Sequence, residues 1–492
     1  MIGNNNSNTS QTFWLSIGNL ITFGFSIISV AILSRYLSKE DYGAYRQVIY
    51  IYGTLLVIFS MGLPKAYGYF IPKVNENQIK DIINKISFIL LIIGVFFSLL
   101  LYFGSGLFAD LLKNEKLDTA LKYFSLVPFF MLPTLGIENI LSALKKSHIM
   151  TMYTILSRSF MLICTVLPVI VFDLGYLVAI QGFVIASFIS FVVALLIKYN
   201  LVKGVVQVKS QVSYKKIYQF ALPLFYVSIW AWIINSSDQF FISRYFGSIE
   251  FATFSNGFFE FPLVSMLVAS TATVLLPVFS GEINKDGILS DEVKRVWDSA
   301  LKKTILLIYP LLVFLFVYAD AMVITLYGES YSDSSIYFKF RTFLSFFQII
   351  AFMPLLLALG ATKYCSKVFM FTAFAIITLE YLAVLVFNSP YAVAVVSVIV
   401  WLGMIFFMAR YIAKAFKIRI VDLFPVKMQL ILVAGCGLAM LIIKLLLSEF
   451  NINIYSEAIV AGVLYLLIVL FVVYRIIGFD FMSILKPILK RK

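Results

Sequence analysis

Two carboxylates lie inside long apolar runs, where an ionisable side chain is costly to bury. Glu260 lies about nine residues, or roughly 13 Å, into one run, and Asn256 precedes it by one helical turn. Asp238 lies in the preceding run and shares a helical face with Asn235. Such groups usually face a bundle interior or a wet cavity. We therefore predict that Asp238 and Glu260 bind a proton or a cation, with structural pairing as the alternative; Glu380 is a lesser candidate.

Cationic side chains gather in the first half of the chain. Arg46 and Lys65 lie at opposite ends of one apolar run, and Arg158 lies about two turns into another. Arginine can hold two oxygens of a phosphate through parallel N–H bonds. These residues therefore predict a basic cavity for an anionic group. Snorkelling of the long side chains to lipid headgroups is the alternative.

The sequence carries no recognisable catalytic or metal-binding pattern. It has no nucleophile elbow and no spacing typical of metal ligands, and its one histidine, His148, lies in a short basic loop. The three cysteines show no pairing pattern, so we expect no disulfide, no metal and no bound cofactor. The net charge of +14 is spread over loops, and no RNA- or DNA-binding module is visible, so we expect no nucleic-acid partner.

The elements that must position these residues are membrane helices. The chain is 61% hydrophobic and 13% charged, far from a soluble domain. Its apolar runs are about twenty residues long, the length that crosses a hydrocarbon core. Met1–Gln11 lacks the pattern of a signal peptide, so we expect the first run to remain as a helix. We predict an all-α integral membrane protein with about fourteen spans, at 12–34, 44–63, 86–103, 121–143, 151–172, 176–197, 219–242, 251–279, 301–319, 335–359, 367–387, 391–412, 428–447 and 456–477.

An internal repeat divides these spans. Ser34-Arg35-Tyr36 returns 209 residues later as Ser243-Arg244-Tyr245, and an acid and two aromatic residues follow each copy. Each copy lies between two apolar runs, so we expect each to join a pair of helices. The repeat predicts two pseudo-symmetric six-helix lobes with a substrate site between them at mid-depth. The expected parts are an N-terminal lobe 1–200, a cytoplasmic linker 201–216, a C-terminal lobe 217–413, and two further helices with a basic tail, 414–492.

The distribution of lysine and arginine predicts the orientation. Cytoplasmic loops retain basic residues. With the N-terminus inside, the inner loops, the adjoining span ends and the C-terminal tail hold 29 of the 39 basic residues, and the outer loops with their adjoining span ends hold 9. We therefore expect both termini in the cytoplasm and both copies of the repeat at the outer rim.

Three stretches resemble a known family. "ILSRYLSKEDYGAYRQV", "YQFALPLFYVSIWAWIINSSDQFFISRYFGSIEFATFSNG" and "ITLYGESYSDSS" are similar to the polysaccharide transporters, or Wzx-type oligosaccharide flippases, of the MATE-like exporter superfamily. The resemblance implies a two-lobed, V-shaped fold that works by alternating access. It also implies that a gradient of H+ or Na+ drives an undecaprenyl-pyrophosphate-linked oligosaccharide to the outer leaflet of a bacterial cytoplasmic (inner) membrane. The implied pathway builds O-antigen of lipopolysaccharide, capsule or exopolysaccharide, with a polysaccharide polymerase and chain-length machinery as possible partners.

This implied substrate suits the residues described above. A pyrophosphate needs a basic cavity of the kind that Arg46, Lys65 and Arg158 could line, while the polyprenyl tail can stay among the membrane lipids. Asp238 and Arg244 belong to the family-like stretch "SSDQFFISRYFG". The lipid II flippase branch also has fourteen spans, but its dense arginines in span one are absent here. The aromatic and amide surface that a sugar chain needs is offered by Trp230, Asn235 and Asn256.

Other functions stay open. A MATE-type multidrug or cation antiporter should line its cavity with carboxylates and aromatic rings, whereas the first lobe here is basic. A multi-spanning polysaccharide polymerase or ligase should carry a large outer loop, and no loop here exceeds roughly 25 residues. A purely structural membrane protein is the last alternative.

Overall fold

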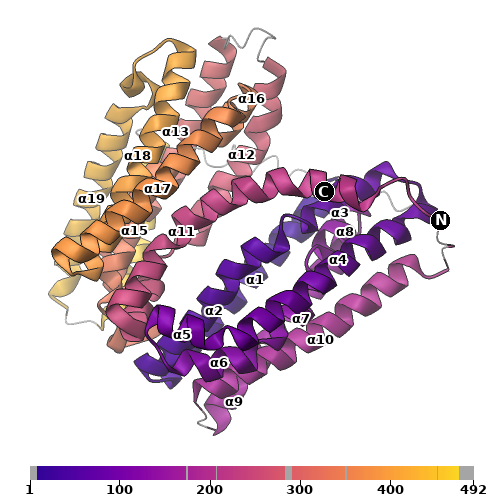
Figure 1. The fold of residues 1–492 in the computed structure, drawn as a ribbon. Coiled ribbons are helices and arrows are strands. Elements are labelled where there is room, and N and C mark those ends of the chain that lie inside the picture. The colour runs from indigo at the N-terminus through magenta and orange to yellow at the C-terminus, as the bar shows by residue number, and fades with distance from the viewer. Residues whose placement is uncertain are drawn as a thin grey trace. The chain divides into compact units, whose positions relative to one another are not determined.

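The fold was derived from a computed structural model that describes residues 8–172, 175–204, 206, 208–282, 291–349, 352–450 and 453–475. Every regular element in these ranges is a helix (Figure 1). The chain divides into two compact units. Unit 1 comprises Met1–Ser255 and Ile376–Val393, and unit 2 comprises Asn256–Ala375 and Ala394–Lys492.

Unit 1 is built on long helices with short, broken ones between them. α9 packs along both α1 and α10, as Figure 1 shows. A buried core of aliphatic and aromatic side chains joins α3, α4 and the start of α11, with Tyr67 fully buried at its centre. The helices of this unit are α1 (Asn8–Tyr36), α2 (Lys39–Ser60), α3 (Pro64–Phe70), α4 (Glu76–Phe103), α5 (Ser105–Leu112), α6 (Lys116–Phe124), α7 (Leu126–Met131), α8 (Ile137–Ala143), α9 (Ser147–Phe172), α10 (Tyr176–Val202) and nearly all of α11 (Tyr214–Gly257), with the end of α17 and the start of α18.

Unit 2 holds the remaining helices. α13 packs against α15 and α19, and α12 packs against α16. The last two helices, α19 and α20, pack against each other as well as on α13. The helices of this unit are α12 (Pro262–Glu282), α13 (Asp291–Val317), α14 (Ala319–Tyr327), α15 (Ser334–Gln348), α16 (Phe352–Ala358), the first half of α17 (Thr362–Phe387), most of α18 (Pro390–Phe416), α19 (Val426–Ser448) and α20 (Ile454–Arg475).

The prediction of a multi-pass, all-helical membrane protein is confirmed. Within the described residues, twelve helices or uninterrupted helix series are long and apolar enough to cross a membrane. The two other expected spans fall on α1 and α12, whose described apolar stretches, Ile21–Tyr36 and Pro262–Ala272, are shorter. The expected span 121–143 is a series of short pieces, α6, α7, a 3-10 turn and α8, because Pro133 and Gly136 interrupt it.

Both copies of the repeat lie at joints between helices. In the first, α1 ends at Tyr36, and the Ser38 hydroxyl accepts a hydrogen bond from the Asp41 amide at 3.1 Å, which caps α2. In the second, the backbone turns at Gly247, with φ 86° and ψ −178°, inside the long helix α11. Only glycine adopts this conformation readily, so the second joint depends on Gly247.

Candidate functional site

Two carboxylates are buried together in unit 1, where α11, α17 and α2 meet. Asp238 is 4% exposed and Glu380 is fully buried. The Ser237 hydroxyl donates a hydrogen bond to the Glu380 carboxylate, which ties α11 to α17. Both carboxylates act electrostatically on Tyr50, whose hydroxyl donates to the Ser236 carbonyl at 3.1 Å. We call Tyr50, Ser237, Asp238 and Glu380 the acidic core.

A cavity of about 380 Å³ adjoins the acidic core within unit 1. Tyr50 and Ser237 belong to both the cavity wall and the acidic core. The rest of the wall is largely aliphatic and aromatic. The lining residues are Tyr50, Ile51, Thr54, Leu55, Phe108, Leu111, Leu112, Trp232, Ile233, Ser236, Ser237, Phe240, Phe241 and Ile377.

A chain of hydrogen bonds connects the two copies of the repeat. The Gln47 amide, fully buried, donates to the Ser243 hydroxyl at 2.7 Å and accepts from Asn114 at 2.5 Å. The backbones also approach closely here, since a Cβ on Gly43 would overlap the carbonyl of Ser248. The two copies are therefore in direct contact, which sequence spacing alone did not reveal.

The three predicted cations lie on three helices of unit 1. Arg46 on α2 is half-buried, and its guanidinium donates to the Ser255 carbonyl at 3.3 Å. Lys65 on α3 and Arg158 on α9 are exposed. Arg158 interacts electrostatically with Tyr52. The predicted basic cavity through all three residues stays a prediction.

Glu260 has a different environment from the one that the sequence suggested. The chain leaves the helix after Gly257 and resumes helical structure at Pro262, so Glu260 lies in a break. The expectation that Asn256 and Glu260 share one helical face is wrong for this reason. In unit 2, Glu260 accepts from the Arg341 guanidinium at 3.1 Å, and the two side chains are 28% and 13% exposed. This pairing is the structural alternative considered for Glu260.

The predicted sugar-binding residues lie in different environments. Asn235 is exposed, and its amide donates to the Ala231 carbonyl at 2.6 Å, one turn back on α11. Asp238, three residues on, is buried. Trp230 is half-buried on the same helix. Asn256 is fully buried in unit 2.

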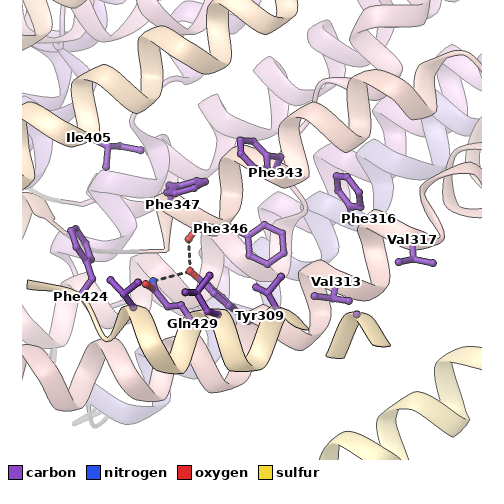
Figure 2. Close-up of a pocket in the computed structure, with 14 residues that line it drawn as sticks. Tyr309, Val313, Phe316, Val317, Phe343, Phe346, Phe347, Ile405, Phe424 and Gln429 are labelled. Carbon is purple, nitrogen blue, oxygen red and sulfur yellow. Dashed lines mark hydrogen bonds between the residues drawn. The ribbon is translucent and has the colours of Figure 1, made fainter. Parts of the chain in front are cut away.

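A second cavity lies in unit 2 and has a volume of about 650 Å³. Figure 2 shows phenylalanine rings of α13 and α15 along its wall, among them Phe316, Phe343 and Phe346. Its polar contact is a short chain in which Gln429 donates to the Tyr309 hydroxyl at 2.8 Å, and that hydroxyl donates to the Phe346 carbonyl at 3.0 Å. The wall is otherwise hydrocarbon, so this groove suits an apolar chain. The sequence pattern did not predict this groove.

The structure also contains a buried cation that the sequence did not predict. Lys198 on α10 is 6% exposed, and its ammonium donates to the Pro133 carbonyl at 2.5 Å and to the Ser87 hydroxyl at 2.9 Å. It binds the carbonyl freed by the break before α8. The signal available was a lysine directly after an apolar run, which is usual for a snorkelling residue. Among the described residues, no group of three or more His, Cys, Asp or Glu side chains is placed to hold a metal.

Three solved structures share this fold. The lipid II flippase MurJ in an inward closed conformation matches with a TM-score of 0.71 and 17% identity, over 94% of this chain and 98% of that one. An inward-facing multidrug resistance MATE transporter of the MOP superfamily matches with a TM-score of 0.60 and 15% identity, over 83% and 99%. A MOP superfamily transporter from Pyrococcus furiosus, with a binding pocket of reverse polarity, gives 0.55 and 13%, over 82% and 94%. At these identities the similarity shows the fold alone, which is MATE- and MurJ-like.

Sequence comparison gives the family. No curated protein matches this chain significantly. Residues 32–336, more than half of the chain, match a family model described as "Polysaccharide biosynthesis protein". This region includes both copies of the repeat. The expected resemblance to polysaccharide transporters is thereby confirmed, and the chain belongs to the polysaccharide biosynthesis protein family.

Proposed function

We propose that this protein is a flippase that moves an undecaprenyl-pyrophosphate-linked oligosaccharide from the inner to the outer leaflet by ion-coupled alternating access. The observation that carries the proposal is the groove of unit 2, a cavity of about 650 Å³ with an almost entirely hydrocarbon wall. A polysaccharide-family protein that handled only free sugars would have no use for such a surface. A lipid-linked sugar presents both a polar headgroup and a long apolar tail, and the groove can take part of that tail.

The acidic core is the proposed coupling site. A charged carboxylate is costly to bury in a low-dielectric interior, so binding of a proton or a cation would relieve part of this cost. Asp238 and Glu380 are both buried, and Ser237 and Tyr50 add neutral oxygens beside them. H+ or Na+ is the proposed ion. Glu380 takes the role first expected for Glu260, because Glu260 is already paired with Arg341.

The headgroup site remains a proposal based on residue chemistry. Lys65, Arg158 and Asn235 are exposed and therefore available to a pyrophosphate or a sugar. Arg46 and Trp230 are half-buried and complete the proposed set in unit 1. Asn256 is fully buried, so it requires a helix movement before it can touch a ligand.

The proposal is tested by reconstitution. Purified protein in vesicles that contain a lipid-linked oligosaccharide should expose the sugar to a membrane-impermeant lectin faster than empty vesicles do, and faster still with an ion gradient. Asp238→Asn and Glu380→Gln should remove the gradient effect. Asp298→Asn, at an acid paired with Lys294 on α13, is the matched control and should retain it. No lectin signal above empty vesicles in any gradient would reject the flippase function.

One observation favours a second candidate, a MATE-type cation antiporter. The cavity of about 380 Å³ is aromatic and adjoins two buried carboxylates, which suits a lipophilic organic cation. Dye efflux from vesicles that depends on Asp238 or Glu380 would support this function over the flippase. A polymerase or ligase finds less support, because the fold is that of transporters.

A further inference from the structure

The short helix α5 is a separate rod with a break at each end. Gly104 ends α4 with φ −90° and ψ 2°, and Lys113 ends α5 in the left-handed region with φ 52°. The N-terminal end is anchored, because the buried Ser105 hydroxyl donates to the Asp118 carboxylate on α6 at 2.6 Å. Rotation about these breaks would move the C-terminal end of α5 most.

α5 forms one wall of the cavity beside the acidic core. Phe108, Leu111 and Leu112 line that cavity from α5. Tyr50 and Ser237 of the acidic core lie in the same lining. Displacement of α5 would therefore open the cavity from that side.

Arg244 holds the C-terminal end of α5. Its guanidinium donates to the Asp110 carbonyl at 3.4 Å and, more closely, to the Leu111 carbonyl. The last carbonyls of a helix have no partner within the helix and carry partial negative charge, so an arginine is a favourable partner. These two bonds join α5 directly to α11. The next residues are tied to the first repeat copy through Asn114 and Gln47.

We propose that α5 is a lid over the acidic core and that Arg244 is its latch. The lid would control access to the proposed coupling site, and in this respect the inference rests on the proposed function. The lid faces the side that the lysine and arginine distribution assigns to the outside. Arg244 is partly exposed, so its guanidinium can exchange the two carbonyls for water or a lipid phosphate when the lid opens. Exchange of hydrogen-bond partners lets the lid open without leaving a charge buried.

Thiol labelling tests the lid without any transport measurement. Thr54→Cys places a thiol in the part of the cavity wall that α2 contributes. The background lacks the three native cysteines, Cys164, Cys365 and Cys436, by substitution with serine. A membrane-impermeant maleimide is added from the outer side, and the labelling rate is measured with and without Arg244→Ala. Arg295→Ala, at an exposed arginine on α13, is the matched control.

We expect the labelling rate to be at least about fivefold higher with Arg244→Ala and unchanged with Arg295→Ala. With Arg244→Lys we expect an intermediate rate, because lysine keeps the charge but lacks the planar guanidinium group. Equal rates with arginine and alanine at position 244 would overturn the latch. If Arg244→Ala lowers expression, a second pair, Asp110→Cys with Arg244→Cys, is joined through two mixed disulfides by a short bis-methanethiosulfonate reagent, which reduction removes. Joining should then slow labelling at position 54 and reduction should restore it. No change on joining would also overturn the lid. Absence of lectin signal with normal lid behaviour would reject the flippase alone.

Discussion

Glu380 shows how much of the role of one residue can be predicted from the sequence and how much requires the structure. A glutamate inside an apolar run already indicated a special environment, but the run gave no reason to prefer it over Glu260. The deciding contact comes from Ser237, 143 residues away, and from the pairing of Glu260 with Arg341. Asp238 could be selected from the sequence because it combines depth with a family-like motif. The contacts between residues far apart in the sequence could not be predicted, since they depend on how the helices pack.

The acidic core predicts a strong effect of neutral substitution. Glu380→Gln and Asp238→Asn keep side-chain size but remove a charge that we propose binds the coupling ion. We expect ion-driven transport to fall about tenfold or more, equivalent to a loss of roughly 1.4 kcal/mol in the coupled step. Transport in reconstituted vesicles measures this, with size-exclusion profiles to verify folding. Wild-type coupling in both variants would show that the two carboxylates serve structure only.

The Arg341–Glu260 pair predicts a stability effect that a double-mutant cycle can isolate. Both groups are largely buried at a break in the helix, so removal of one leaves the other charge without its partner. We expect Arg341→Ala to lower stability by an amount between the ~1 kcal/mol of exposed pairs and the ~3–5 kcal/mol of fully buried ones. The double variant with Glu260→Gln should recover part of this loss. Additive losses in thermal unfolding would mean that the two side chains do not stabilise each other.

At the scale of elements, the positions of the helices followed from composition, but their interruptions followed only in part. Apolar runs of about twenty residues located the spans. Proline bends or breaks a helix, and the structure has a full break before Pro262. The division of span 121–143 and the separate helix α5 were not predicted, because both rest on carbonyls bound from other helices. Lys198 binds one at Pro133, and Arg244 binds those at the end of α5.

Close packing of α9 on α10 predicts opposite outcomes for two helical glycines. A Cβ on Gly182 would overlap the carbonyl of Cys164, so Gly182→Ala must push the two helices apart and should cost about 1–3 kcal/mol. Gly403 in α18 has no neighbouring atom within 4 Å of the added carbon. Gly403→Ala should therefore be neutral or stabilise by about 0.5–1 kcal/mol through helix propensity. Melting temperatures of the two purified variants decide, and a lowered value for both would point away from packing at Gly182.

For the whole molecule, the repeat predicts two pseudo-symmetric lobes, and this stays a prediction. The structure has two compact units of a MATE- and MurJ-like fold, and the first unit extends to Ser255 and includes Ile376–Val393. The prediction of symmetry rests on the residue types that the two copies share at a fixed spacing. The sequence did not predict the cavities, which form where side chains from four or more helices leave space. The groove of unit 2 combines α13, α15, α18 and α19, whose contributing residues are spread over more than a hundred positions. An apolar groove of this kind is therefore visible only in three dimensions.

Sidedness is the whole-molecule property on which the direction of transport depends. The distribution of basic residues predicts that the segment 113–116, after α5, is outside and that the segment 144–146, after α8, is inside. Reporter fusions should accordingly give alkaline phosphatase activity at the first segment and fluorescence of a cytoplasmic reporter at the second. Reversed signals would place the Arg244 latch on the cytoplasmic face, so that α5 would control entry of the lipid-linked substrate instead of release. Because the two segments are separated by one span series, α6 to α8, opposite signals also test whether that broken series crosses the membrane once.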